Sequence, residues 1–161
     1  MKSPAQTAAK GPSNCSVPAL MEPQATAFPA PGTLDDVLGF ELIEASAEGC
    51  RGRFAVERRV QQPFGLVHGG AYAALAESLA SLTTHLAVAP AGEIAVGQSN
   101  NTTYLRPAVE GTVHAEGQPL HRGRTSWVWD VRFTDDEERL CAISRVTIAV
   151  RPRPGGGSSG R

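Results

Sequence analysis

Residues 71–86 restrict the fold of this chain more than any other segment, because they are rich in Ala and Leu and predict one long helix. These residue types cost least to place in a helix, and Pro63 and Gly65 break the chain just before it. We expect the helix to begin near Gly69. The other long segments show the alternation that is typical of strands. A single apolar helix among strands needs a sheet to cover it.

Six strands are predicted around this helix. They are expected over residues 40–45, 52–60, 94–105, 111–121, 125–133 and 139–150. The alternation is clearest where Trp127, Trp129, Val131 and Phe133 share one face of a strand. Short turns between the last four strands imply antiparallel pairing. The predicted fold class is therefore α+β, with a curved antiparallel sheet wrapped around one long central helix.

The length of 161 residues allows one domain with a real core. Residues 1–32 are rich in Pro, Ala, Ser and Gly and predict a disordered N-terminal extension, and residues 154–161 predict a flexible tail. The domain is expected over residues 33–153. It should start with a short helix over residues 33–39, with Thr33 as its N-cap and Gly39 as its end.

Charge and cysteine content exclude several classes of partner. The formal net charge of −1 gives no basic field for nucleic acid, and no run approaches the roughly twenty apolar residues that span a membrane. Cys15, Cys50 and Cys141 lie far apart, which argues against a disulfide framework and against a zinc site. We expect a cytoplasmic protein without a metal.

The start of the long helix combines residues that suit chemistry on a carbonyl group. His68, Gly69 and Gly70 offer backbone N–H groups with little side chain to shield them, at a helix end that carries partial positive charge. Glu77 interrupts the apolar run, and Ser81 follows one turn later. Donors, a carboxylate and a hydroxyl are thus expected along one groove. Taken alone, Glu77 is equally well explained as a helical glutamate that faces water.

Other chemistry-bearing residues receive a structural interpretation. His85, His114 and His121 have no metal-ligand spacing with any acid or cysteine, so they are assigned no role. Trp127 and Trp129 are read as core residues rather than as a stacking platform for a ligand.

Several motifs of the sequence resemble the hotdog-fold acyl-CoA thioesterases that use a helical glutamate. The strongest are Gln-Pro-Phe-Gly-Leu-Val-His-Gly-Gly at 62–70 and Leu-Ala-Glu at 75–77, and the resemblance extends over residues 34–153. Further matching segments are residues 95–100, 106–107, 125–131, 139–142 and 149–153. Within this group the chain is most similar to 4-hydroxybenzoyl-CoA thioesterases of the Arthrobacter type. Glutamate at position 77 differs from the aspartate that is usual in the phenylacetyl-CoA branch.

The resemblance implies a set of catalytic residues. Glu77 corresponds to the catalytic carboxylate, Gly69 to the N–H that polarises the thioester carbonyl, and Gln62 to a residue that orients substrate or water. Ser81 stands where the family has threonine and keeps the hydroxyl that assists the catalytic water, and His68 is expected beside the thioester. The carboxylate either attacks the carbonyl carbon directly or acts as a general base on water.

The resemblance also implies contacts to coenzyme A, which is part of the substrate, so that no separate cofactor is expected. Arg106, Arg124 and Thr125 match positions that contact the pantetheine and phosphates. Arg124 departs from the family, which has serine there. Arg153 is the nearest match to an arginine at the nucleotide end, although Pro154 occupies the aligned position.

The expected function is hydrolysis of 4-hydroxybenzoyl-CoA by a homotetramer made of two hotdog dimers, with active sites at subunit interfaces. Alternatives on the same fold are a thioesterase for dihydroxynaphthoyl-CoA, gentisyl-CoA or phenylacetyl-CoA, and a protein that binds acyl-CoA without cleaving it. A hydratase would need a paired Asp and His in another loop, which the sequence does not offer.

Overall fold

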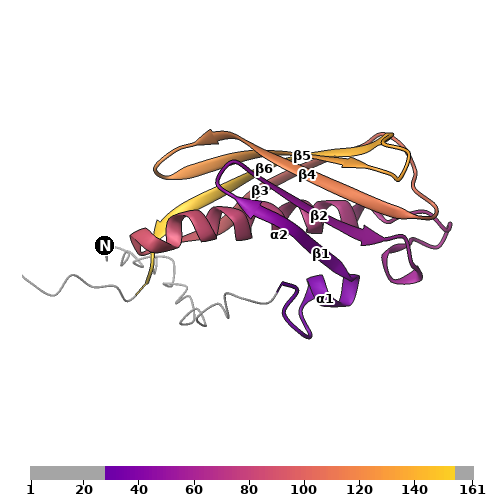
Figure 1. Cartoon of the computed structure of the whole chain (residues 1–161), viewed down its shortest axis with the longest axis horizontal. Coiled ribbons are helices and arrows are strands. Elements are labelled where there is room, and N and C mark those ends of the chain that lie inside the picture. Colours follow the sequence, from indigo (N-terminus) through magenta and orange to yellow (C-terminus); the bar gives the residue numbers. More distant parts are fainter. Residues whose placement is uncertain (1–27, 155–161) are drawn as a thin grey trace, which may run out of the picture.

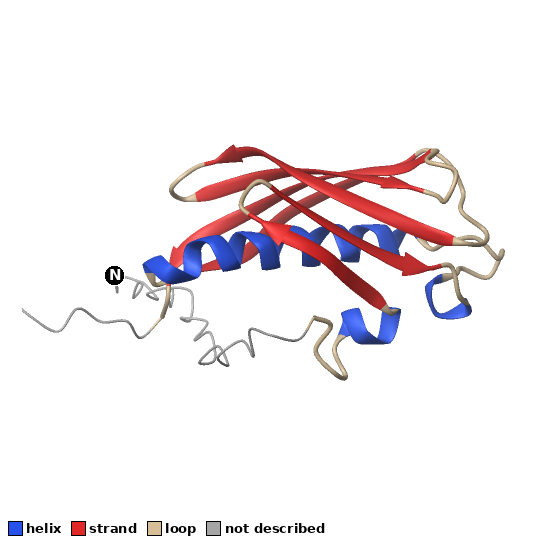
Figure 2. Cartoon of the chain, viewed as in Figure 1, coloured by secondary structure: helices blue, strands red, loops and turns tan. Residues whose placement is uncertain are grey.

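Helix α2 (Gly69–Val88) lies along the concave side of a six-stranded antiparallel sheet (Figures 1 and 2). The computed structural model describes residues 28–154. The sheet contains β1 (Phe40–Ser46), β2 (Gly49–Ala55), β3 (Glu93–Tyr104), β4 (Thr112–Arg122), β5 (Ser126–Thr134) and β6 (Leu140–Pro152). This arrangement confirms the predicted fold class.

The strands do not all pair in the order of the sequence. Their order across the sheet is β1-β2-β4-β5-β6-β3, so β3 is an edge strand that pairs with β6 rather than with β4. Residues 105–111 connect β3 to β4. At the start of this connection, the backbone N–H groups of Leu105 and Arg106 both donate to the carbonyl of Cys141 in β6. The crossing brings β3 beside α2 at the rim of the sheet (Figure 1).

The core lies between α2 and the concave face of the sheet. Leu75 and Leu79 of the helix are fully buried, as are Phe54, Trp129 and Phe133 of the sheet. Trp127 and Trp129 are both buried and their rings stack with centroids 6.1 Å apart, which confirms that they are core residues. Because the concave side is filled in this way, only one stripe of α2 reaches the surface.

One predicted strand is wrong in its second half. Residues 52–60 were expected to form a strand, but β2 ends at Ala55 and η1 (Arg58–Val60) turns the chain instead. Val60 is buried beneath this turn, so its hydrophobic side chain reflects core packing rather than strand alternation. The backbone N–H of Val60 donates to the carbonyl of Glu57, which closes the turn.

The short helix before β1 forms as predicted. It is α1 (Leu34–Leu38), with the Thr33 hydroxyl accepting from the N–H of Asp36 and with Gly39 in the left-handed region at φ 70°. The disordered extension predicted for residues 1–32 lies outside the described residues except for its last five, in which Phe28 is half-buried against the core. Of the predicted tail, only Pro154 is described.

Within residues 28–154, no helix has the length and apolar character needed to cross a membrane. Helix η2 (Ala89–Ala91) follows α2 directly and leads into β3.

Substitution of two neighbouring threonines of α2 tests how much a buried hydrogen bond contributes to the free energy of unfolding. The indole N–H of Trp129 donates to the Thr84 hydroxyl at 2.9 Å, and both side chains are fully buried. We expect Thr84→Val to lower the free energy of unfolding by about 1–3 kcal/mol, because the indole N–H loses its acceptor. Urea unfolding followed by tryptophan fluorescence measures the change.

Thr83→Val is the matched control for this substitution. Thr83 is equally buried, and its hydroxyl has no oxygen or nitrogen partner in the described part of the chain. The Cys50 thiol lies beside it, and burial raises the pKa of this thiol to about 11, with the Thr83 hydroxyl lowering it slightly. Thr83→Val should change stability much less than Thr84→Val. Equal losses in the two variants would contradict a specific role for the Trp129 bond.

Candidate active site

A tight turn before α2 sets the direction from which the chain enters the helix. The N–H of Gln62 donates to the carbonyl of Leu66 at 2.9 Å, and the N–H of Gly65 donates back to the carbonyl of Gln62 at 3.0 Å. Gly65 has φ 84°, a left-handed conformation that side chains disfavour. The turn therefore explains why glycine follows the Pro-Phe pair, and it places Gln62 near the helix start.

His68 caps the N-terminus of α2 with its own side chain. Its Nδ1 accepts from the N–H of Gly70 at 2.9 Å. A ring that accepts at Nδ1 carries its proton at Nε2 when it is neutral, so the exposed Nε2–H is left to donate outward. The cap uses the Gly70 donor, whereas the Gly69 N–H has no acceptor among the residues that the structure describes.

A cavity of about 620 Å³ opens beside this free donor. Its walls include Gln62, His68, Gly69, Tyr104 and Arg106. A methyl group built on Gly69 would lie 2.6 Å from the Tyr104 ring, so a larger residue at position 69 would require the tyrosine to move. Four residues that the sequence singled out therefore meet at the N-terminal end of α2.

Glu77 lies two turns further along the helix, in a different cavity. Its side chain is exposed, and its neighbours in this cavity of about 570 Å³ include Ser81 and the apolar residues Leu34, Ala74 and Leu82. The predicted pairing of Glu77 with Ser81 on one face is thus present. Asp35 also lines the cavity, but its carboxylate already accepts from the Ser78 hydroxyl at 2.6 Å.

One chain does not form the single groove expected from the sequence. Glu77 follows Gly69 by eight residues, which places their backbones about 12 Å apart along the helix axis. The Gly70 N–H, which was expected to point into that groove, is occupied by His68. The Gly69 N–H and the Glu77 carboxylate therefore lie in two separate cavities of the same chain.

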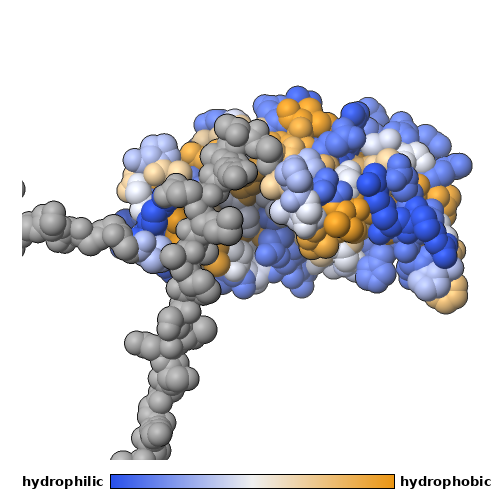
Figure 3. Space-filling model, turned by 90° about the horizontal axis from the view of Figure 1, so that it is seen from below, coloured by the Kyte–Doolittle hydropathy of each residue, from blue (hydrophilic) through white to orange (hydrophobic). Residues whose placement is uncertain are grey.

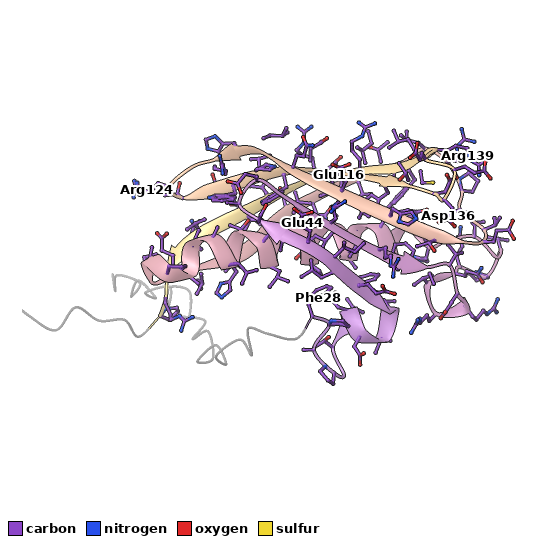
Figure 4. All side chains as sticks on the ribbon, in the orientation of Figure 1. Phe28, Glu44, Glu116, Arg124, Asp136 and Arg139 are labelled. Atoms are coloured by element: carbon purple, nitrogen blue, oxygen red, sulfur yellow. The ribbon has the colours of Figure 1, made fainter. Side chains whose placement is uncertain are left out.

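The candidate residues for coenzyme A divide between the two ends of α2. Arg106 belongs to the N-terminal cavity. Arg124 and Thr125 form the turn between β4 and β5 at the other end of the molecule, where Figure 4 shows Arg124 far from Arg139. Arg153 also lies at that end, because its N–H donates to the carbonyl of Gly92, just after η2.

Three residues of β3 contact the site and were not predicted from the sequence. They are Gly97 beside Glu77, Asn100 bonded to the helix backbone, and Tyr104 beside Gly69. Gly97 and Asn100 lie in the matching segment 95–100, but the resemblance gave them no role, and strand alternation alone does not tell which face of an edge strand meets a helix. Tyr72 was also missed; burial raises the pKa of its phenol, which stays neutral at the inner wall of the N-terminal cavity.

In the described range 28–154, no three His, Cys, Asp or Glu side chains come together in the way that a metal ion would need.

The six-stranded antiparallel sheet around one long helix is the hotdog fold. Residues 64–142, which include α2, β3, β4 and β5, match the thioesterase superfamily. The solved structure of thioesterase HI1161 from Haemophilus influenzae is similar, with a TM-score of 0.73 and 32% identity over 78% of this chain and 87% of the other.

Two relatives are similar in sequence over most of their own length. The chain is 39% identical over 119 residues to the proofreading thioesterase EntH of Cronobacter turicensis, covering 74% of this chain and 86% of the relative. It is 34% identical over 120 residues to the 1,4-dihydroxy-2-naphthoyl-CoA hydrolase of Listeria monocytogenes, covering 74% and 97%. The chain belongs to the thioesterase superfamily, and the prediction of a thioesterase is confirmed.

The role of His68 as a helix cap can be tested by measurements of stability. We expect His68→Ala to lower the free energy of unfolding by about 1 kcal/mol, because the Gly70 N–H loses its acceptor. His68→Asn should recover most of this loss, since the Asn oxygen also caps helices well. Thermal and urea unfolding of the two variants provide the measurement. Equal stability of the Ala and Asn variants would contradict the capping role.

Proposed function

We propose that this thioesterase hydrolyses an aromatic acyl-CoA, with 4-hydroxybenzoyl-CoA as the preferred substrate and 4-hydroxybenzoate and coenzyme A as products. The observation that carries the proposal is that α2 presents an unused amide donor at Gly69 and an exposed carboxylate at Glu77. The resemblance to Arthrobacter-type 4-hydroxybenzoyl-CoA thioesterases supports the choice of acyl group.

Gly69 supplies the electrostatic part of this chemistry. Hydrolysis of a thioester builds negative charge on the carbonyl oxygen, and an amide donor at a helix N-terminus stabilises that charge without reorganisation. Because glycine has only a hydrogen atom in place of a side chain, the substrate oxygen has room to approach the Gly69 N–H. The His68 cap holds the first turn in place, and His68 lines the same cavity.

Glu77 acts on the carbonyl carbon in one of two ways. Attack by a carboxylate oxygen breaks the C–S bond, releases coenzyme A as its thiolate and leaves an anhydride that water cleaves. Alternatively, the carboxylate takes the proton of a water molecule that attacks the carbon itself. In both routes Ser81 and Gln62 orient the water. Both routes remain part of the proposal, because each begins with the Glu77 carboxylate.

The separation along α2 implies that two chains share each site. An oxyanion donor and a nucleophile must both lie within about 3–3.5 Å of the thioester carbonyl, whereas Gly69 and Glu77 of one chain are about 12 Å apart. We infer that Gly69 of one subunit meets Glu77 of another across a dimer interface, and that two such dimers form a tetramer. The exposed side chains of Val96 and Tyr104 on the edge strand β3 favour such an interface, and Figure 3 shows hydrophobic residues among hydrophilic ones on the face seen from below.

A shared site also accounts for the divided coenzyme A residues. Arg106 lies at one end of α2, whereas Arg124, Thr125 and Arg153 lie at the other. Residues from two subunits would be needed to follow a substrate as long as coenzyme A from its thioester to its nucleotide. The cationic side chains suit its phosphates. Cys50 and Cys141 are free, buried thiols, which supports a location in the reducing cytoplasm.

A second acyl group is favoured by one relative. The similarity to the 1,4-dihydroxy-2-naphthoyl-CoA hydrolase of Listeria monocytogenes extends over 97% of that protein. The bicyclic naphthoyl group is larger than a hydroxybenzoyl group, so the two candidates differ in the cavity volume that they need beside Glu77. A panel of benzoyl-, 4-hydroxybenzoyl-, gentisyl-, phenylacetyl-, dihydroxynaphthoyl- and alkyl-CoA substrates distinguishes them by kcat/KM.

Glu77→Gln tests the function itself. We expect kcat for the best substrate of the panel to fall by about 10²–10⁴-fold or more, because the amide neither attacks the carbonyl nor takes a proton. The melting temperature should stay unchanged, since the side chain is exposed. Release of coenzyme A thiol provides the assay. Glu110→Gln, another exposed glutamate outside both cavities, is the control that should keep full activity. Wild-type turnover by Glu77→Gln would contradict the proposed function.

Mixing two damaged chains tests whether subunits share a site. In a hybrid of Glu77→Ala and Gln62→Ala chains, one site is intact and the other carries both changes. If half of the dimers are hybrids, about a quarter of all sites are restored. We therefore expect the exchanged mixture to reach about a quarter of wild-type activity, above the mean of the two parents. Activity equal to that mean would place each site within one chain.

A further inference from the structure

Strand β3 contacts α2 at the level of Glu77 as well as at the helix start. Asn100 donates from its side-chain Nδ2 to the carbonyl of Ala73 at 2.9 Å. Ala73 lies four residues before Glu77, so its carbonyl is the acceptor that α-helix geometry assigns to the Glu77 N–H. Asn100 is thus bonded to the helix turn on which Glu77 stands.

The amide of Asn100 is held in this orientation by a chain of hydrogen bonds. The Thr102 hydroxyl donates to the Asn100 Oδ1 at 3.0 Å, and the hydroxyls of Thr102 and Ser144 lie 2.7 Å apart. Since Thr102 has a single hydroxyl proton, Ser144 is the donor in the second bond. Ser144 is 1% exposed, so the chain starts in the core of β6 and ends on the helix backbone.

This chain also fixes which end of the amide faces the helix. Turning the amide over would place Oδ1 against the Ala73 carbonyl and Nδ2 against the Thr102 hydroxyl. The first of these contacts joins two acceptors and is repulsive, so the observed orientation is the one that satisfies every group. Asn100 therefore anchors α2 by a directional bond rather than by packing alone.

Gly97 leaves the space beside the strand that the Glu77 carboxylate occupies. A methyl group built on Gly97 would lie 2.6 Å from Oε1 of Glu77 and 3.2 Å from its Cδ. The side chain of Glu77 therefore rests in space that any other residue at position 97 would fill. Since Gly97 does not have a positive φ, its backbone would accept alanine, and the carboxylate would have to move instead.

An irregularity in β3 brings both residues to the same side. In a regular strand, residues 97 and 100 would point to opposite faces, because successive side chains alternate. The register between β3 and β6 shifts between Gly97 and Ser99, which inserts one residue and reverses the alternation. The bulge is thus what allows Gly97 and Asn100 to face α2 together.

We propose that Gly97 and Asn100 are positioning residues that set the place of the Glu77 carboxylate, Asn100 by anchoring its helix turn and Gly97 by leaving room for its oxygens. The proposal rests on the proposed function, in which Glu77 carries the chemistry. It adds that the edge strand of the same chain, and not only the dimer partner, determines how well the carboxylate meets the thioester.

Gly97→Ala tests the room beside Glu77. We expect kcat to fall by about 10²-fold, as for a displacement of about 1 Å, while KM changes by less than about threefold. The melting temperature and the oligomeric state should stay near those of the wild type, because the carboxylate is a mobile end that can move aside. Coenzyme A release, differential scanning fluorimetry and size-exclusion chromatography provide the measurements.

A double substitution shows whether Gly97 acts through the carboxylate. Glu77→Asp shortens the side chain and withdraws it from the methyl group of alanine at position 97. The double variant should therefore turn over no more slowly than the slower of the two single variants. Effects that multiply, as expected for two independent kinds of damage, would overturn the role of Gly97.

Asn100→Ala tests the anchor, with Asn101→Ala as its matched control. Asn101 is the next residue of the same strand and is exposed. We expect Asn100→Ala to lower kcat at least tenfold more than Asn101→Ala, with KM changed by less than about threefold. Equal kcat values for the two variants would overturn the anchoring role. If Glu77→Gln is inactive while Gly97→Ala and Asn100→Ala keep full kcat, the proposed function stands and only this inference fails.

Discussion

The burial of α2 in the concave face of the sheet is the constraint on which the rest of this structure depends. Leu75 and Leu79 are fully buried, so one side of the helix is committed to the core. A carboxylate is tolerated only on the stripe that remains open, because an unpaired buried charge is too costly. Glu77 and Ser81 occupy that stripe, and the chemistry of the chain is thereby confined to one edge of the molecule.

The geometry of a helix then separates the parts of the candidate site. Its first turn provides the free N–H of Gly69, whereas Glu77 lies two turns away. A straight helix cannot bring this N–H and this carboxylate to the same atom. In the proposed dimer, a second copy of the helix, related by symmetry and running the other way, would bring the start of one helix to the middle of another. In this view assembly is part of the chemistry, since neither cavity of one chain contains a complete set of groups.

The edge strand β3 links the fold to the site at three points. Tyr104 packs closely against Gly69, Asn100 bonds the helix backbone, and Gly97 leaves space for the carboxylate. At positions 97 and 100 the strand has a small or polar residue where it would ordinarily carry a bulky hydrophobic one. The strand is therefore adapted to the groups on α2 rather than to filling the core, which is consistent with its exposed position at the rim of the sheet.

Local sequence was sufficient to predict the long helix, most of the strands and the capping of α1, because propensity, alternation and turn residues act between neighbours. It failed at residues 58–60, where Val60 turns into the core, and it placed Glu77 and Gly70 in one groove. Only the tertiary structure decided that β3 pairs with β6, that a bulge turns Gly97 and Asn100 toward α2, and that His68 occupies the Gly70 donor. The features of β3 depend on packing and hydrogen bonds between residues far apart in the chain, which no short-range pattern records. The His68 cap is a local contact, but histidine is not among the residues that usually cap helices, so the sequence did not indicate it.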